Sequence, residues 1–499
     1  MTLNKTSEPL FHRIILSLAV IIYGITAWNS HGFFYPDEHY QVLEFVGLKL
    51  GINEPWNLSW EYHEQIRSSV QPALAYVIIQ LCNCLGLNDI YDQVVVLRLL
   101  TAVLALLSVS FFVKTVLTNN YIKQSRLYIF LSYFLLFIPF LSVRFAAETW
   151  GGLLLLIPTA FLLQKNQPNP FIIGLLFGLS FVFRFQMAIS IVGILLWIYI
   201  IRKENLNYLF KICISGLLVV SLATCIDAWF YGEFVFTPWQ YFSATLFDND
   251  LPRFHETPFY RYPIDIIIAF TPLLGLFVLI GAGYFFLKQN KNIVTWIIIP
   301  FLAIHSLVPH KEIRFLIPIL FYVPLIVCVF IDKLNELNNV KLGDIGKWIG
   351  QLLLVVFLIV NAYVIYGNSI KAAGRSKIGM AHYIHNNYKD KKINIIHTAH
   401  ANPYQPWGAD IRFYLDTNYI THQVNTICNI NRSYLVDSLH NILVIRQSDL
   451  ELYPSCLKHF EALNLKLEKQ LFAAPLLAIH PYYQLFESDK NLMLYSWNK

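Results

Sequence analysis

Long apolar runs recur along the first 370 residues, and they constrain the fold more than any other feature of the sequence. Eleven runs can be recognised: Ile14–Trp28, Val94–Val116, Leu127–Val143, Gly152–Leu163, Phe171–Phe183, Ala188–Ile201, Leu209–Phe230, Ile264–Leu287, Ile293–Leu307, Phe315–Ile331 and Trp348–Ile365. A helix that crosses a bilayer upright needs about 20 apolar residues. Several runs are shorter, and we expect flanking aromatic residues to complete them. The pattern predicts an all-α polytopic membrane protein with about eleven transmembrane helices.

The composition of the chain leads to the same class. Hydrophobic residues make up 56% of the 499 residues and charged residues 14%, whereas an average globular protein has about 25% charged residues. So few charges cannot cover a soluble protein, and disordered and collagen-like chains are excluded as well. The formal net charge of +6 requires no nucleic-acid partner, because Lys and Arg gather in the cytoplasmic loops of membrane proteins. The lipid bilayer is the expected partner.

Basic residues indicate how the helices are oriented. They fall in alternate connections between the apolar runs, namely Arg13, Lys123 and Arg126, Lys165, Arg202 and Lys203, Lys288 and Lys291, and the stretch Lys333–Lys347. All of these reach the cytoplasm only if the moderately apolar segment Val70–Leu85 does not cross the membrane, so we expect it to lie in the outer interface. The first outer loop, residues 29–92, and the C-terminal tail then face the extracytoplasmic side, either the ER lumen or the bacterial periplasm.

Residues 371–499 differ in composition from the rest of the chain. Lysines become frequent, and short β-rich runs occur at Ile393–His397 and Ile442–Ile445. We therefore expect a transmembrane domain over residues 1–370 and a small extracytoplasmic α/β domain over residues 371–499. Cys428 and Cys456 lie in this tail. They can form a disulfide if it faces an oxidising compartment, and the sequence leaves this open.

Two adjacent carboxylates follow the first apolar run, in the segment YPDEHYQ (residues 35–41). Charges at a membrane edge are costly unless they are solvated or used. One interpretation is a solvated loop at the membrane edge. The other is a general base, because a carboxylate beside a sugar hydroxyl can accept its proton. In the second interpretation Asp37 is the predicted base, with Glu38 as its orienting partner or as the base itself.

An aromatic segment, WNLSWEY (residues 56–62), comes next and is followed by Arg67. Trp and Tyr are ordinary residues of a membrane interface, so anchoring explains the segment as well as sugar binding does. A third segment, PHKEIRF (residues 309–315), places four titratable residues between two apolar runs. At the centre of a helix each charge would cost roughly 2.5–3.5 kcal/mol, so they must lie at the outer interface. Lys311 and Arg314 are three apart and would share one helix face, and Arg can bind phosphate with a bidentate fork.

Further polar residues among the apolar runs have less specific explanations. They are Arg144 with Glu148 at a helical spacing of four, Arg184, and the segment DAWFYG (residues 227–232), each of which is also consistent with a buried ion pair or an interface anchor. His397 and His400 are three apart, but no Cys or acidic residue nearby completes a metal site. The sequence contains no Walker loop, dinucleotide-binding glycine motif, nucleophile elbow or zinc-protease motif.

At these segments the chain resembles the family 22 glycosyltransferases, the mannosyltransferases of lipid-linked oligosaccharide and GPI-anchor synthesis, and most of all the subgroup that adds the third mannose of GPI anchors. The matching residues are PDEH with Gln41, LSWEY (58–62), Arg67-Ser68, Ile226-Asp227 with FYG (230–232), and HKEIRF (310–315). They occur in the same order over residues 30–320, and HKEIRF is the most specific of them.

The resemblance implies a GT-C membrane fold and a polyprenyl-phosphate sugar donor, typically dolichyl-phosphate mannose. It implies inversion at the anomeric carbon and a glycan or glycolipid acceptor. It also implies no metal and no cofactor, because cationic side chains can hold the lipid phosphate that leaves. We expect Asp37 and Glu38 to act in catalysis and His310, Lys311, Arg314 and Arg67 to bind the donor phosphate. Contacts with the substrates are expected at Trp60, Glu61, Glu148 and Arg184.

Three segments depart from the pattern of this family. RFAAE (144–148) stands where relatives have an Arg-x-x-x-Asn-x-x-Glu string, Arg184-Phe185-Gln186 replaces Arg-Pro-Thr, and TPFY (257–260) replaces His-Pro-Trp-His. The departures affect expected acceptor contacts, so the acceptor and the donor sugar stay open. The alternative is a polyprenol-linked lipid transporter or flippase without transferase activity. A transporter needs polar residues at mid-membrane depth, whereas here they gather toward one face.

Overall fold

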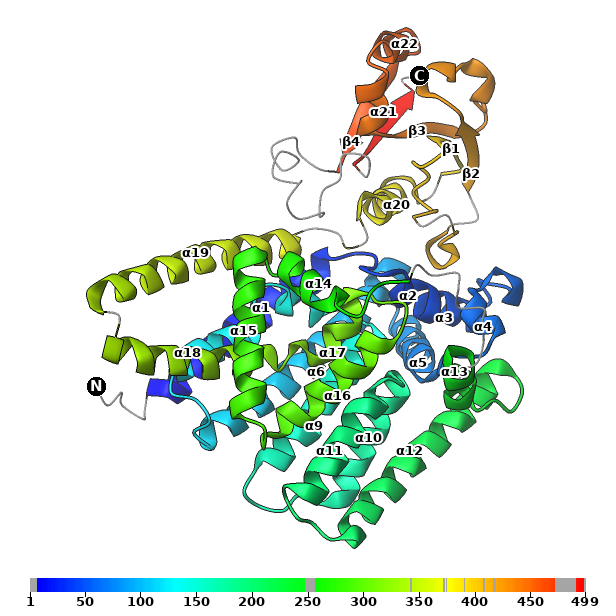
Figure 1. Cartoon of the computed structure of the whole chain (residues 1–499). Helices are drawn as coiled ribbons and strands as arrows, with labels where there is room; N and C mark the ends of the chain where they lie inside the picture. Colours follow the sequence, from blue (N-terminus) through cyan, green and yellow to red (C-terminus); the bar gives the residue numbers. More distant parts are fainter. Residues whose placement is uncertain are drawn as a thin grey trace. The chain divides into compact units, whose positions relative to one another are not determined.

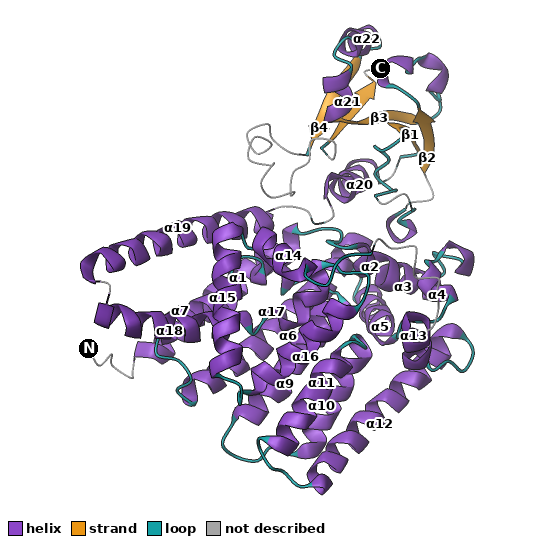
Figure 2. Cartoon of the chain, viewed as in Figure 1, coloured by secondary structure: helices purple, strands orange, loops and turns teal. Residues whose placement is uncertain are grey.

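The computed structural model describes residues 7–246, 256–341, 343–370, 373, 375–389, 391–406, 409–415, 419–471 and 491–497. The chain forms two compact units. The first, here called the helical unit, contains Met1–Trp28, Trp60–Val77 and Val96–Ile370. The second, here called the α/β unit, contains Asn29–Ser59, Ile78–Val95 and Lys371–Lys499. Figures 1 and 2 show helices along most of the chain and the strands near its C-terminal end.

Each predicted apolar run falls on one or two helices. In chain order these and the neighbouring helices are α1 (Ser7–Asn29), α4 (Trp60–His63), α5 (Val70–Cys84), α6 (Ile90–Thr118), α7 (Ser125–Phe134), α8 (Ile138–Leu141), α9 (Ala147–Leu163), α10 (Pro170–Phe183), α11 (Met187–Ile200), α12 (Leu206–Tyr231), α13 (Thr237–Leu246), α14 (Arg261–Ala269), α15 (Pro272–Lys288), α16 (Ile293–Leu307), the 3₁₀ turn η4 (Ile313–Leu316), α17 (Ile317–Leu320), α18 (Val323–Lys341) and α19 (Gly343–Ile370). Residues of α5 and α6 belong to both units.

Three predicted runs are broken rather than continuous. Leu127–Val143 divides into α7 and α8, Ile264–Leu287 into α14 and α15, and Phe315–Ile331 into η4, α17 and α18. Pro139, Pro272 and Pro318 stand at the starts of the helices that follow these breaks, where proline is tolerated because the N–H groups of a first turn have no partner within the helix. Thr271, directly before Pro272, lies outside the helical region (φ 71°, ψ 150°), as expected of a residue before proline. The connection predicted at Lys333–Lys347 is largely helical, since α18 continues to Lys341 and α19 begins at Gly343; Leu342 lies outside the described residues.

Four helices in the described part of the chain are long and apolar enough to cross a membrane: Glu8–Asn29, Ile90–Thr118, Leu206–Tyr231 and Gly350–Ile370. Two bent pairs, Pro272–Lys288 with Ile293–Leu307 (119°) and Ile313–Leu320 with Val323–Glu336 (71°), raise the number to six if each pair is one span. Helices α5, α9, α10 and α11 are apolar but shorter. The chain is therefore a multi-pass membrane protein, while the number of eleven spans and the interfacial position of Val70–Leu85 stay predictions.

Small residues allow the helices of the helical unit to approach closely. A Cβ atom on Gly174 of α10 would lie 2.1 Å from the carbonyl oxygen of Ile212 in α12. A Cβ atom on Gly193 of α11 would lie 2.0 Å from the carbonyl oxygen of Trp296 in α16. Glycine is required at both places, since real Cβ contacts are not this short. Such close backbone contacts are typical of helix packing in membranes, where dispersion rather than water exclusion holds helices together.

The α/β unit contains a five-stranded sheet in the order β2-β1-β3-β5-β4. Strand β1 is parallel to β2 and β3, and β5 is antiparallel to β3 and β4. All six residues of β1 are buried, as expected of a central strand. The elements of this unit are α2 (Pro36–Glu38), the π turn η1 (His39–Leu43), α3 (Glu44–Lys49), η2 (Pro55–Asn57), α20 (Arg375–Tyr388), β1 (Ile393–Thr398), η5 (Arg412–Tyr414), β2 (Tyr419–Val424), η6 (Ile427–Asn429), η7 (Arg432–Tyr434), β3 (His440–Arg446), α21 (Gln447–Leu452), α22 (Cys456–Ala462), β4 (Leu465–Gln470) and β5 (Leu492–Trp497).

The two cysteines of the tail form a disulfide between η6 and α22. The Cα atoms of Cys428 and Cys456 are 5.2 Å apart. Cys456 is buried in the same hydrophobic core as Ile396, Leu443 and Tyr495. The disulfide thus ties a loop and a helix to the sheet, which decides the alternative that the sequence left open.

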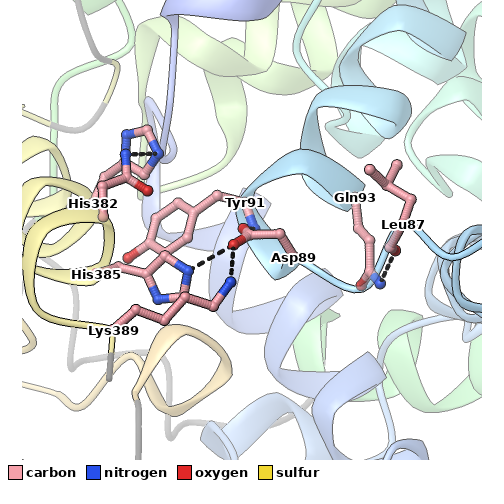
Figure 3. Close-up of polar contacts among 8 residues, drawn as sticks. Leu87, Asp89, Tyr91, Gln93, His382, His385 and Lys389 are labelled. Carbon is pink, nitrogen blue, oxygen red and sulfur yellow. Dashed lines mark hydrogen bonds and ion pairs between the residues drawn. The ribbon is translucent and has the colours of Figure 1, made fainter. Parts of the chain in front are cut away.

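A cluster of polar groups joins α20 to the residues just before α6 within the α/β unit (Figure 3). One carboxylate oxygen of Asp89 accepts hydrogen bonds of 2.8 Å from both His385 Nε2 and Lys389 Nζ. Burial alone would raise the pKa of Asp89, but these two donors outweigh it and hold the pKa well below its usual range. The ring of Tyr91 packs beside that of His385, with 4.9 Å between their centroids.

Candidate active site

The basic loop between α16 and α17 is organised around Glu312. Its carboxylate lies 2.8 Å from His310 Nε2, accepts a hydrogen bond of 2.9 Å from Arg314 Nη2, and forms an ion pair with Arg314 in which Nε is 2.7 Å away. Arg314 is buried at the start of η4. Because one carboxylate fixes both side chains, the guanidinium of Arg314 has a defined orientation.

Lys311 has a different role in the fold of this loop. Its ammonium donates hydrogen bonds to the carbonyl oxygens of Thr257 (2.8 Å) and Val308 (2.6 Å). Burial lowers the pKa of Lys311 from its usual range. An ammonium has three donors, so these two contacts leave one donor for another acceptor. Lys311 thereby joins the TPFY segment to the basic loop, which the backbone bond from Thr257 N to Pro309 O (2.9 Å) reinforces.

A second arginine meets the same loop. Arg184, in the turn between α10 and α11, forms an ion pair of 3.3 Å with Glu148 at the start of α9, and both side chains are about 95% buried. The guanidinium carbons of Arg184 and Arg314 lie 5.6 and 5.4 Å from the centroid of the Phe315 ring, within the range of cation–π attraction. Two arginines that are far apart in the sequence therefore contact one aromatic ring.

We call this group the Phe315 cluster; its members are Glu148, Arg184, His310, Lys311, Glu312, Arg314 and Phe315. Its three permanent cations exceed its two carboxylates by one charge. The Phe315 cluster suits an anionic ligand, because guanidinium forks match phosphate geometry.

Arg144 is not a member of this cluster. It lies ahead of α9, which begins at Ala147, so the helical spacing of four to Glu148 does not apply. Its guanidinium carbon lies 5.4 Å from the centroid of the Phe140 ring.

Arg67 is connected to this group through Tyr241. The guanidinium carbon of Arg67 lies 5.8 Å from the Tyr241 ring centroid, the Tyr241 hydroxyl accepts a hydrogen bond from Gln186, and the Tyr241 and Phe185 rings are 5.5 Å apart. Phe185 and Gln186 are the residues that depart from the family pattern beside Arg184. Tyr241 is not predictable as a site residue, because nothing in the aromatic-rich sequence distinguishes it from its neighbours.

Helix α12 holds the backbone that carries Arg67. The buried carboxylate of Asp227 accepts hydrogen bonds from Ser69 N (2.6 Å), Ser69 Oγ (2.7 Å) and Thr237 Oγ1 (2.6 Å). One turn later, the Tyr231 hydroxyl donates to the carbonyl oxygen of Arg67 (2.8 Å). The FYG segment and Asp227 thus fix the turn in which Arg67 lies.

Asp227→Asn should destabilise the protein and misplace Arg67. The amide N–H of Asn can face the Thr237 hydroxyl, which can accept it, but Ser69 N and Oγ then bond to a neutral oxygen, and hydrogen bonds to a charged group are roughly twice as strong as neutral ones. We expect a lower melting temperature together with a higher KM for the sugar donor. Tyr231→Phe removes only the bond to Arg67, so it should raise the donor KM with a smaller change in melting temperature. If both variants have the donor KM and melting temperature of the wild type, α12 does not position Arg67.

Trp60 and Glu61 lie on the short helix α4, just before the turn that carries Arg67. Glu61 is buried, whereas Trp60 is partly exposed. The carbonyl oxygen of Glu61 accepts a hydrogen bond from Ile66 N (3.2 Å), which closes this turn. The structure thus brings Trp60, Glu61 and Arg67 into one local segment of the helical unit, while their predicted contacts with substrates stay predictions.

Asp37 and Glu38 belong to the α/β unit, at the start of a helix. Pro36 occupies its first turn, where proline is favoured, and the two carboxylates stand in the same turn, where the helix dipole stabilises negative charge. Glu38 is buried and its Oε2 accepts a hydrogen bond from Phe34 N (3.0 Å), whereas Asp37 is only partly buried. The residues that follow form a π turn, an element that often occurs at functional sites.

The described residues contain no group of three or more His, Cys, Asp or Glu side chains that could hold a metal ion. His397 is buried at the end of β1, and its Nδ1 lies 3.0 Å from the carbonyl oxygen of Thr398. Burial, the largest effect, lowers the pKa of His397.

Comparison with known proteins identifies relatives along most of the chain. The model of the Alg9-like mannosyltransferase family matches residues 14–407. GPI mannosyltransferase 3 of Drosophila melanogaster is 24% identical over 412 residues, which cover 79% of this chain and 69% of the relative. GPI mannosyltransferase 3 of Debaryomyces hansenii is 21% identical, covering 81% and 73%.

Among solved structures, ArnT from Cupriavidus metallidurans aligns over 97% of both chains. Its apo structure gives a TM-score of 0.52 at 11% sequence identity, and its structure bound to undecaprenyl phosphate gives 0.51 at 10%. At such low identity the likeness concerns the fold alone, and it supports the GT-C fold that the motifs implied. The family model covers far more than half of the residues. The chain therefore belongs to the Alg9-like mannosyltransferase family and is a membrane glycosyltransferase.

Proposed function

We propose that this enzyme moves a mannosyl residue from a polyprenyl-phosphate donor of the dolichyl-phosphate type to a glycan or glycolipid acceptor, with inversion at the anomeric carbon. A GPI-type glycolipid is the first acceptor to consider, because relatives from Drosophila melanogaster and Debaryomyces hansenii are named GPI mannosyltransferase 3. The undecaprenyl phosphate bound to ArnT supports a lipid-phosphate donor for a chain of this fold.

The observation that carries the proposal is the Phe315 cluster. Arg184 and Arg314 contact one ring, and carboxylates set their orientation. In the proposed mechanism Arg314, His310 and the remaining donor of Lys311 hold the donor phosphate, with Arg67 as a further cation. Arg184 and Glu148 contact substrate, as do Trp60 and Glu61. Charge builds up on the phosphate oxygen as the sugar leaves, so fixed cations stabilise the transition state more than the ground state.

Asp37 is the proposed base. The acceptor hydroxyl oxygen attacks the anomeric carbon while the carbon–oxygen bond to phosphate breaks, and the electron pair of that bond stays on the phosphate. The proton of the hydroxyl passes to the Asp37 carboxylate. Glu38 orients the turn, since its carboxylate is engaged by the Phe34 N–H, whereas Asp37 is less buried. The polyprenyl phosphate can leave without a metal ion when cationic side chains neutralise its charge.

We also propose that the reaction takes place at the extracytoplasmic face. The Cys428–Cys456 disulfide supports an oxidising compartment for the tail. The alternate placement of basic connections favours the same side for residues 29–92. The ER lumen and the bacterial periplasm both satisfy these conditions.

Purified protein in lipid nanodiscs should transfer labelled mannose from β-linked dolichyl-phosphate mannose to a GPI-precursor glycolipid. The product should be an α-mannoside, as analysed by linkage-specific mannosidase digestion, and transfer should persist in excess EDTA. Loss of activity in EDTA that added divalent metal restores would contradict the metal-free mechanism. In sealed proteoliposomes, movement of the donor across the bilayer without any mannosylated product would instead support the transporter alternative.

A further inference from the structure

One buried carboxylate of the α/β unit, that of Glu44, has no role in the proposed mechanism. Glu44 is 3% exposed, and its side chain joins three segments. Oε1 lies 2.6 Å from His39 Nε2 and accepts a bond of 3.1 Å from Phe413 N, while Oε2 accepts a bond of 2.5 Å from Asn53 Nδ2. Burial of a charge is costly unless donors surround it, and these three donors meet that requirement.

The bond between His39 and Glu44 depends on the π turn after Asp37 and Glu38. Residues five apart point about 140° away from each other in an α-helix. Here the N–H of Glu44 bonds to the carbonyl oxygen of His39, and this i→i+5 pattern aligns the two side chains. The side-chain pair therefore stabilises the π turn, and the π turn sets the direction in which the preceding turn presents Asp37.

Glycine at position 47 is part of the same arrangement. A Cβ atom there would lie 2.7 Å from Asn53 Nδ2 and 3.7 Å from the Phe413 ring. The Asn53 amide also donates to the carbonyl oxygen of Glu44 (2.9 Å). A larger residue at 47 would displace the amide that supports Glu44.

Aromatic rings extend the contact with the C-terminal segment. The His39 ring, which is fully buried, stacks between Phe33 and Tyr414, with centroid distances of 4.9 and 5.5 Å. Tyr414 in turn stacks on Tyr91 at 4.6 Å, and the Tyr40 hydroxyl donates to the carbonyl oxygen of Ala409 (2.8 Å). Residues 409–414 thus contact the π turn and the start of α3, which directly follow the helix of Asp37, through a backbone N–H, a carbonyl and a ring.

We propose that Glu44 is a positioning residue for Asp37, and that it acts by bonding the π turn of the first loop to the C-terminal segment at Phe413. The inference rests on the proposed function, in which Asp37 is the base. It assigns the C-terminal segment a part in catalysis, because one donor to the Glu44 carboxylate is the N–H of Phe413, 369 residues away in the sequence.

The first test is turnover of the full-length Glu44→Gln enzyme in nanodiscs. The amide N–H of Gln would face the N–H of Phe413, His39 or Asn53, so one bond must break. A displaced catalytic group can cost on the order of 10²-fold, and we expect kcat to fall roughly 10- to 100-fold. The donor KM should stay within about twofold, because the proposed phosphate-binding residues belong to the helical unit. A smaller folded fraction would also lower the apparent kcat at constant KM, so kcat is expressed per donor-binding site titrated in each preparation.

Asp449→Asn is the matched control. Asp449 is also a buried carboxylate of the α/β unit, and it accepts bonds from Thr398 Oγ1 (2.7 Å), Arg446 N (3.1 Å) and Arg446 Nη2 (2.6 Å). The Asp449→Asn substitution loosens the C-terminal tail without removing a donor to Glu44, so kcat should remain close to that of the wild type. Equal losses of kcat in Asp449→Asn and Glu44→Gln would overturn the proposal in favour of general loosening.

Hydrogen exchange provides a readout that does not depend on the base. The peptide covering residues 411–415 should exchange faster in Glu44→Gln, but not in Asp449→Asn or Asp37→Asn. Unchanged exchange in Glu44→Gln, or unchanged kcat, would refute the positioning role.

Asn53→Ala is the second variant if Glu44→Gln does not accumulate. It removes one donor to Glu44 and should still lower kcat several-fold at constant donor KM. Full turnover of Asn53→Ala would refute the positioning role equally. If Asp37→Asn stays active, the proposed base is wrong, and the exchange experiment still decides whether Glu44 holds the C-terminal segment.

Discussion

Asp37→Asn is expected to lower turnover by ~10²–10⁴, the usual contribution of a general base. The amide has the same shape as the carboxylate but cannot accept the proton of the acceptor hydroxyl. Asp37 is partly exposed in the first turn of its helix, so the substitution should leave expression and donor binding close to those of the wild type. Single-turnover transfer from labelled donor and a separate binding measurement would distinguish the two effects.

Glu38→Gln is the natural comparison for this variant. One oxygen of Gln can still accept the Phe34 N–H that Glu38 binds at 3.0 Å, so we expect a loss of turnover well below that of Asp37→Asn. The reverse order of effects would exchange the roles of the two residues and leave the mechanism intact. Full activity in both variants would mean that no carboxylate of this turn acts as the base.

Arg314→Lys is expected to weaken donor use by roughly ten- to a hundredfold. One lost hydrogen bond to a charged group costs about 1.5–3 kcal/mol, and an ammonium cannot reproduce a bidentate fork. The guanidinium of Arg314 also contacts the Glu312 carboxylate through Nε and Nη2. The Lys substitution would therefore also weaken the contact that orders the basic loop. Initial rates over a range of donor concentrations give the change in kcat/KM.

Arg202→Lys provides a control with similar local geometry. Arg202 pairs with Glu204, two residues away, at 3.1 Å, as Arg314 pairs with Glu312, but it lies in a different loop, between α11 and α12. We expect kcat/KM for the donor to be unchanged in this variant. If Arg314→Lys also behaves like the wild type, Arg314 does not bind the phosphate.

The sequence predicted the elements of this fold better than their breaks. Apolar runs of sufficient length become helices because a membrane leaves their backbone groups no other partners, and each predicted run is helical. The predicted runs ignored Pro139, Pro272 and Pro318, which interrupt three of them. These breaks are predictable from local rules, since proline lacks the N–H that continuing the preceding helix would need and is tolerated in the first turn of a new helix.

Long-range pairings within the site were beyond the reach of the sequence. The segments PDEH and HKEIRF could be selected because their charges stand at the ends of apolar runs. The ion pair of Glu148 with Arg184 and the bond from Phe413 to Glu44 depend on which distant segments meet, and local periodicity carries no such information. The sequence also suggested a boundary at residue 370, whereas the unit with the C-terminal sheet takes in residues 29–59 and 78–95 as well.

The three-part composition of the α/β unit has a consequence for biosynthesis. Its first segment leaves the ribosome long before its last strand, β5, which ends at Trp497 and pairs with both β3 and β4. Domains usually fold from the N-terminus as they are synthesised, but Glu44, which follows the helix of Asp37 and its π turn, cannot acquire its partner at Phe413 until most of the chain has been translated. Membrane insertion therefore precedes completion of this helix's environment, and a chain that ends before the sheet would be inserted but catalytically immature.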